Sequence, residues 1–81
     1  MTDGAHLEDS ILELLARRRR GLSICPSEVA RALAPDDWRP LMSAIREAAD
    51  RLAARGAVEV VQRGLPVIAT TARGPIRIRR A

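Results

Sequence analysis

The sequence predicts an α+β fold, a winged helix-turn-helix domain with about three helices and a small antiparallel sheet of two or three strands. Three features of the chain predict it. A short helical pattern begins at Pro26, a turn follows from Ala34 to Asp37, and a longer helical pattern continues to Arg55. A turn of this length joins the two helices of a helix-turn-helix. The valine-rich segment that comes next is punctuated by glycine, and it lies where a winged helix carries its wing.

The length and charge of the chain limit what it can be. Its 81 residues are enough for one domain with one small core. We expect residues 1–8 to form a flexible N-terminal tail and residues 9–81 to form the winged-helix domain. The formal net charge is +4, from fourteen arginines and no lysine against ten acids. Positive charge suits a polyanionic partner, although an arginine-rich, lysine-free composition is also typical of a G+C-rich genome.

The composition offers little for catalysis. One cysteine, Cys25, and one histidine, His6, exclude an internal disulfide and give no complete metal site, and no glycine-rich phosphate loop is present. We therefore expect no enzyme activity, no cofactor and no metal. The first twenty residues contain four acids and no continuous apolar stretch, so we expect neither a secretory signal nor a membrane span, and a cytoplasmic location.

A stripe of leucine and isoleucine predicts the first helix, from about Asp9 to Arg20. Asp9 is the expected N-terminal cap and Gly21 the C-terminal cap. The arginines of the last predicted turn, residues 17–20, would complement the negative end of the helix. The following segment, residues 22–24, is too short for an independent strand and is expected to pair with the later hairpin.

The next two helices are predicted from their end signals. Pro26 suits the first position of a helix, and Pro35 ends it. Asp36 or Asp37 is the expected cap of the third helix. Trp38 is the only aromatic residue, and its spacing predicts a core anchor for this helix rather than a platform for a stacked ligand.

The C-terminal third predicts a hairpin and one more strand. Residues 58–61 form the first arm, residues 63–66 the turn and residues 67–68 the return arm. Residues 69–73 form a connector without a recognisable pattern. Residues 76–80 alternate isoleucine and arginine, which predicts a strand with its isoleucines buried and its arginines on the other face.

The third helix carries the first set of candidate DNA contacts. Arg39, Ser43 and Arg46 fall on one polar face, near the end that a recognition helix points at base edges. Arginine also matches the two hydrogen-bond acceptors of guanine. Glu47 and Asp50 share the far side of the helix and would repel phosphate, so an ordinary solvated face is the alternative interpretation.

The wing and the last strand carry the second set. Arg63 lies at the tip of the predicted wing, and Arg77 and Arg79 would project side by side from the strand. A phosphate between two arginines would relieve their repulsion, although arginine on an edge strand also guards against aggregation. The absence of Phe and Tyr removes the aromatic platform on which most single-strand binders stack bases, which favours duplex DNA.

Two blocks of sequence resemble a known family. Cys-Pro-Ser-Glu-Val-Ala at residues 25–30 and Gly-Pro-Ile-Arg-Ile-Arg at residues 74–79 are similar to a family of small bacterial proteins classed as a domain of unknown function. The resemblance spans about Leu7 to Arg79. It implies a winged-helix fold, and it carries over no activity and no catalytic residue.

Together these features predict a protein that binds double-stranded DNA, and a small transcriptional regulator is one such protein. The third helix would enter the major groove and the wing would follow the backbone. The alternative is a winged-helix module that binds another protein and not DNA, because a fold does not fix a function.

Overall fold

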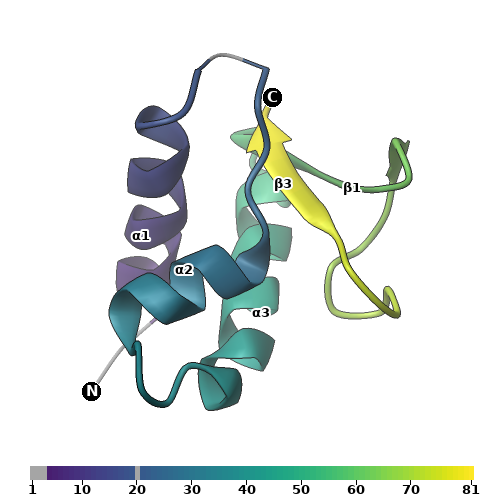
Figure 1. The fold of residues 1–81 in the computed structure, drawn as a ribbon. Helices are drawn as coiled ribbons and strands as arrows, with labels where there is room; N and C mark the ends of the chain where they lie inside the picture. The colour runs from purple at the N-terminus through teal and green to yellow at the C-terminus, as the bar shows by residue number, and fades with distance from the viewer. Residues whose placement is uncertain (1–3, 20) are drawn as a thin grey trace.

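The computed structural model describes residues 4–19 and 21–81. Its elements are α1 (Gly4–Ala16), α2 (Pro26–Leu33), the 3-10 helix η1 (Arg39–Leu41), α3 (Met42–Ala54), β1 (Val58–Gln62), β2 (Leu65–Pro66) and β3 (Arg77–Arg80). The three α-helices form one side of the molecule and the small sheet covers the other (Figure 1). This α+β fold has the predicted composition of elements and is compatible with a winged helix.

Helix α1 begins at Gly4, five residues before the predicted start at Asp9. Leu7 is buried in the core, and Arg51 of α3 donates hydrogen bonds to the Gly4 carbonyl oxygen and to the Glu8 carboxylate. These contacts add a turn to the helix, so residues 4–8 are not a flexible tail. Residues 1–3 of the predicted tail lie outside the described residues.

Helix α1 also ends earlier than predicted, at Ala16. The chain leaves the helix through a turn in which Arg17 and Arg18 donate backbone hydrogen bonds to the preceding residues 14 and 15. Arg17, Arg18 and Arg19 are therefore not in the last helical turn, and Arg20 lies outside the described residues. The side chain of Arg80, far along the chain, instead donates to the Leu15 carbonyl oxygen at 2.8 Å. The Leu15 carbonyl oxygen, which also accepts from the Arg18 amide, therefore accepts two hydrogen bonds at the helix end.

Helix α2 starts as predicted, with Pro26 in its first turn. The predicted cap of the third helix is wrong, because neither Asp36 nor Asp37 caps it. The chain passes through η1 first, and the residue before η1 is Trp38, which makes no side-chain capping bond. The Asp37 amide instead donates to the Ala34 carbonyl oxygen within the turn.

The sheet has the strand order β2-β1-β3, and β1 is antiparallel to both neighbours. The hairpin turns on two residues, Arg63 and Gly64, whose φ angles are 54° and 81°. A two-residue turn with both φ angles positive matches the twist of the strands. The return arm therefore begins at Leu65, two residues before the predicted residues 67–68.

Residues 67–76 join β2 to β3. This segment contains the predicted connector of residues 69–73, and from here on the whole of it is called the connector. Strand β3 lies between β1 and Ile24, and Ile24 and Ile78 exchange two backbone hydrogen bonds of 2.8 Å. The predicted pairing of residues 22–24 with the hairpin is wrong, because Ile24 forms its bridge with Ile78 of β3.

The core lies between the helices and the inner face of the sheet. Its largest fully buried side chains come from every layer: Leu7, Ile11, Leu15, Ile24, Val29, Ile45, Leu52, Ile76 and Ile78. Trp38 packs against this core but remains partly exposed, so it anchors the third helix less deeply than predicted. Within the described part of the chain, no helix is long and apolar enough to cross a membrane.

Candidate nucleic-acid interface

The structure separates the predicted polar face of the third helix into different environments. Arg39 is the first residue of η1 and is exposed. Ser43 is exposed in the first turn of α3. Arg46, one turn further, is half-buried against the connector. Only Arg39 and Ser43 of the three present their polar groups to solvent.

Arg46 holds the connector through the main chain. Its guanidinium donates hydrogen bonds to the carbonyl oxygens of Ala69 at 2.9 Å, Ala72 at 3.0 Å and Gly74 at 2.9 Å. Three of the five N–H donors of an arginine are thereby used within the molecule. This geometry identifies Arg46 as a brace for the connector, with few donors left for an external ligand.

Asp50, one helical turn after Arg46, binds the same segment from the same helix. Its carboxylate accepts hydrogen bonds from the amides of Ala69 at 2.6 Å and Thr70 at 3.1 Å, and from the Thr70 hydroxyl at 2.8 Å. We call Arg46 and Asp50 the connector clamp. The carboxylate of Asp50 therefore faces amide groups, not open solvent.

Sequence reasoning missed the connector clamp because its partners lie 19 to 28 residues further along the chain. A basic and an acidic residue four positions apart on one helix face usually predict an ion pair with each other. Here each binds the backbone of a segment that has no pattern of its own. Gln62 of β1 holds the other side of this segment, donating to the Arg73 and Pro75 carbonyl oxygens.

The two strand arginines have the predicted orientation but also have partners. Ile78 is buried, whereas Arg77 and Arg79 point away from the core. Arg77 donates to the hydroxyl and the carbonyl oxygen of Ser23 at 2.8 and 2.9 Å. Arg79 forms an ion pair of 2.8 Å with Glu59 on the neighbouring strand. Each guanidinium is therefore held against its own sheet.

Arg63 differs from the strand arginines. It lies in the exposed two-residue turn of the hairpin, and within the described residues its side chain has no hydrogen bond and no ion pair. The hairpin and the connector also expose two apolar side chains, Leu65 at 68% and Ile68 at 60%. The hairpin therefore presents one free guanidinium beside an apolar surface.

The remaining arginines divide in the same way between partnered and unpartnered groups. Ion pairs with carboxylates hold Arg17, Arg18, Arg51 and Arg55. Five arginines donate to no carboxylate, hydroxyl or carbonyl oxygen among the residues that the structure describes, and we call them unpartnered: Arg19, Arg31, Arg39, Arg63 and Arg73. Apart from Arg19, these unpartnered arginines lie on the last turn of α2, in η1, in the hairpin turn and in the connector.

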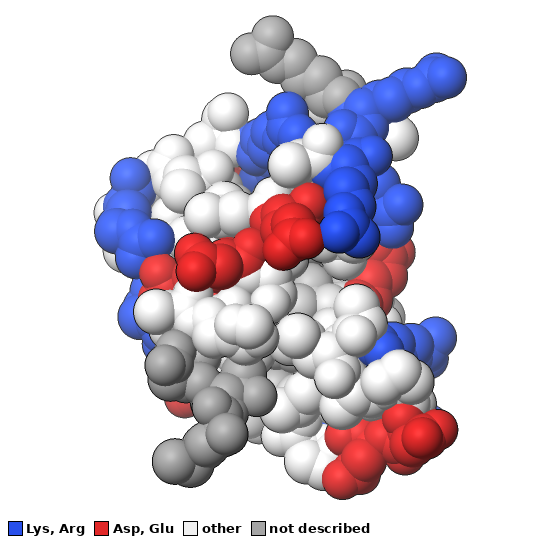
Figure 2. Space-filling model, turned by 90° about the vertical axis from the view of Figure 1, so that its left-hand side faces the viewer, with Lys and Arg blue, Asp and Glu red and all other residues white. Residues whose placement is uncertain are grey.

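The α1 face shows the opposite arrangement. Figure 2 shows acidic side chains in a band between groups of basic ones on this face. Glu8 accepts hydrogen bonds from Arg51 at 2.6 Å and Arg55 at 2.7 Å. The hydrogen bond from Arg51 is the main cause of a pKa of Glu8 below its ordinary value, and that from Arg55 adds to it. Glu8 therefore neutralises Arg51 and Arg55 within the protein.

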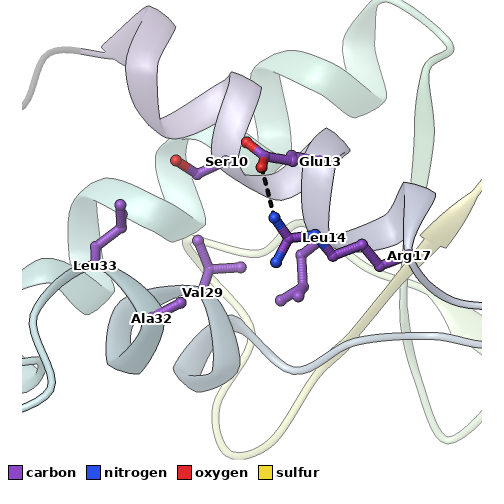
Figure 3. Close-up of a pocket in the computed structure, with 7 residues that line it drawn as sticks. All are labelled: Ser10, Glu13, Leu14, Arg17, Val29, Ala32 and Leu33. Atoms are coloured by element: carbon purple, nitrogen blue, oxygen red, sulfur yellow. Dashed lines mark hydrogen bonds and ion pairs between the residues drawn. The ribbon is translucent and has the colours of Figure 1, made fainter.

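A groove of about 220 Å³ separates α1 from α2 (Figure 3). It is lined by Ser10, Glu13, Leu14, Arg17, Val29, Ala32 and Leu33. Val29 and Leu33 project from α2 toward α1, and the ion pair of Glu13 with Arg17 spans the rim at 2.8 Å. Its volume is below that of a usual small-molecule site. In the described ranges, no group of His, Cys, Asp and Glu side chains could hold a metal ion.

Comparison with known proteins places the chain in a family. No curated protein matches the sequence. The family model described as "Protein of unknown function (DUF3253)" matches residues 4–81. This match covers nearly the whole chain, as does the predicted resemblance to a family of unknown function. The protein therefore belongs to the DUF3253 family.

Proposed function

We propose that the protein binds double-stranded DNA, as a small transcriptional regulator does. The observation that carries the proposal is the location of the unpartnered arginines. Arg39 precedes α3, Arg63 forms the hairpin turn and Arg73 lies in the connector. In a helix-turn-helix the second helix lies in the major groove, and in our proposal the hairpin and the connector lie beside it on the duplex. The ion-paired arginines of the α1 face would lie on the opposite side from the DNA.

In this arrangement α3 enters the major groove and the hairpin follows the backbone. Ser43 is the exposed polar side chain of the first turn of α3, and Glu47 is exposed one turn later. A carboxylate on this face disfavours close approach to phosphate, so α3 would make few base contacts. We therefore expect phosphate contacts to supply most of the affinity and sequence preference to be modest.

The connector clamp fixes the position of the hairpin relative to α3. Arg46 and Asp50 fix the connector to α3 through hydrogen bonds to its main chain. The hairpin, which the connector follows directly, is thereby held in one orientation relative to the helix. Contacts that are already in place cost less conformational entropy when a ligand binds.

A salt titration of binding to random duplex DNA tests the proposal. We expect a dissociation constant of roughly 1 to 100 µM near physiological salt, and a steep fall in affinity as salt rises, because phosphate contacts release counterions. Binding to a single strand of the same sequence should be weaker, since the chain has one aromatic residue for stacking bases. No binding at about 50 mM salt, or a flat salt response, would contradict the proposal.

The exposed apolar side chains favour a second candidate, a protein-binding module that does not bind DNA. Leu65 and Ile68 are both exposed and lie three positions apart on the hairpin and the connector, where apolar side chains would contact a protein partner. Wild-type protein with a flat salt response toward DNA would favour this candidate. Under the DNA-binding proposal, Leu65→Ser leaves the salt dependence of DNA binding unchanged.

A further inference from the structure

The geometry points to a phosphate-binding clamp formed by Arg31 and Arg39 on the ring of Trp38, at the turn between α2 and α3. We call these three residues the Trp38 clamp. The inference rests on the proposed function, and it names a contact with the DNA backbone that the sequence did not predict, since Arg31 was not among the candidate residues. It also gives Arg39 a role in binding phosphate in place of one in reading bases.

The guanidinium carbons of Arg31 and Arg39 both lie over the same indole ring. The Cζ atom of Arg31 and that of Arg39 each lie 4.5 Å from the centroid of the Trp38 ring. The two carbons are therefore separated by no more than twice this distance. The attraction between a guanidinium and the face of an indole holds each side chain near the ring. Trp38 packs against the core, so the ring itself has a fixed position.

Stacking fixes these two arginines without using their donors. A guanidinium that lies over a ring keeps its N–H groups in its own plane, directed outward. In the described part of the chain, neither Arg31 nor Arg39 donates to a carboxylate or a carbonyl. Arg46 is the contrast, since its donors are bound to carbonyl oxygens. The Trp38 clamp thus offers two ordered cations whose hydrogen bonds are not yet made.

An anion completes this arrangement. Two guanidiniums over one ring repel each other, and the negative charge of a phosphate that accepts a hydrogen bond from either one offsets that repulsion. Asp36 and Asp37 lie in the same turn and are exposed, but neither forms an ion pair with Arg31 or Arg39. The unpaired cations are therefore available to an external phosphate.

The position of the Trp38 clamp suits the backbone of a duplex. Arg31 is in the last turn of α2, and Arg39 is the first residue of η1, which leads into α3 (Figure 1). In a helix-turn-helix the first helix crosses the DNA backbone while the second lies in the major groove. A rival role for Arg31 is to complement the negative end of α2, which requires no ligand.

The test compares two double variants that lose the same charge. Arg31→Ala with Arg39→Ala removes the cations of the Trp38 clamp, whereas Arg17→Ala with Arg55→Ala removes cations that are ion-paired with Glu13 and Glu8. Affinity for a random duplex is measured over a range of salt. We expect the clamp variant to lose about two units of the slope of log K against log salt, and the control to lose less than about half a unit.

The fluorescence of Trp38 gives a second readout, because the chain has one tryptophan and no tyrosine. We expect DNA to protect Trp38 from acrylamide quenching in the wild type and in the control variant, but not in the clamp variant. Thermal melting checks that each variant is folded. If the alanine variant has no cooperative transition, Arg31→Gln with Arg39→Gln keeps long side chains over the ring and is measured in the same way.

The outcomes separate this inference from the proposed function. Wild-type binding with an unchanged slope in the clamp variant would overturn the inference and leave DNA binding intact. Equal losses of slope in the clamp variant and in the control would also overturn it, because net charge alone would explain the effect. A wild type that does not bind duplex DNA would overturn both.

Discussion

Within the described part of the chain, the arginines of the α1 face have acidic partners, whereas those on the side that carries η1, the connector and the hairpin do not. On the α1 face, Arg51 and Arg55 share the carboxylate of Glu8, and Arg17 is paired with Glu13. On the other side, Arg39 and Arg63 have no acidic partner in the described residues. The net charge of +4 does not by itself indicate where a polyanion would bind. The proposed DNA-binding surface rests instead on which arginines lack a partner.

The second side itself contains two kinds of arginine. Arg46 has its donors on main-chain carbonyls and organises the connector, whereas Arg63 has its donors in solvent. Replacing an arginine of the first kind should lower the stability of the fold, whereas replacing one of the second kind should weaken DNA binding.

Arg46→Ala should destabilise the fold by about 2 to 4 kcal/mol, because three carbonyl oxygens lose a charged donor. One of them belongs to Ala69, which is fully buried. Urea unfolding measures the effect. Arg73→Ala, which removes an exposed arginine of the connector, is the control and should change stability by less than about 0.5 kcal/mol. Equal losses in the two variants would show that Arg46 does not brace the connector.

Arg63→Asn should weaken DNA binding without weakening the fold. Asparagine tolerates the positive φ of 54° at this position, and Asn-Gly is a favoured hairpin turn. The salt slope should fall by about one unit, while the melting temperature stays the same or rises. Arg79→Gln is the comparison, since Glu59 already neutralises Arg79. A larger loss of slope for Arg79→Gln than for Arg63→Asn would contradict the division between partnered and free arginines.

The smallest effect concerns pH and the α1 face. The pKa of Glu8 is lower in the folded protein than its ordinary value, so the ionised carboxylate stabilises the fold at neutral pH. This contribution is complete above the unfolded pKa of about 4.3 and is lost as pH falls below it toward the folded pKa. The melting temperature of the wild type should therefore fall more steeply with acid than that of Glu8→Gln. Parallel curves for the two proteins would show that the contacts of Glu8 with its arginines do not contribute.

Local signals predicted much of the fold. Pro26 begins α2, and the alternation around Ile78 produces a strand with one buried face. These features depend on residues a few positions apart, which a sequence shows directly. The helix ends were predicted less well, because α1 extends to Gly4 through contacts with Arg51 on another helix.

The candidate site was harder to predict than the fold. Arg46 fell on the expected polar face of α3, but its role depends on a connector whose conformation is set by α3 itself. Trp38 was expected to be fully part of the core, and its stacking with Arg31 and Arg39 depends on how α2 approaches η1. Spacing along one helix does not contain this information, because the partners come from separate elements.

The two-residue strand β2 also limits how this domain can meet other chains. Leu65 is paired with Gln62, and the Val67 amide donates to Val60 of β1, so in an antiparallel ladder the main chain of residue 66 faces outward. That residue is proline, which has no N–H to offer a further strand. This edge of the sheet therefore offers an incoming strand a carbonyl oxygen but no amide at residue 66, which disfavours its extension by another molecule. A protein partner at the hairpin would be held mainly by side chains, and the same proline helps to protect the sheet from edge-to-edge aggregation.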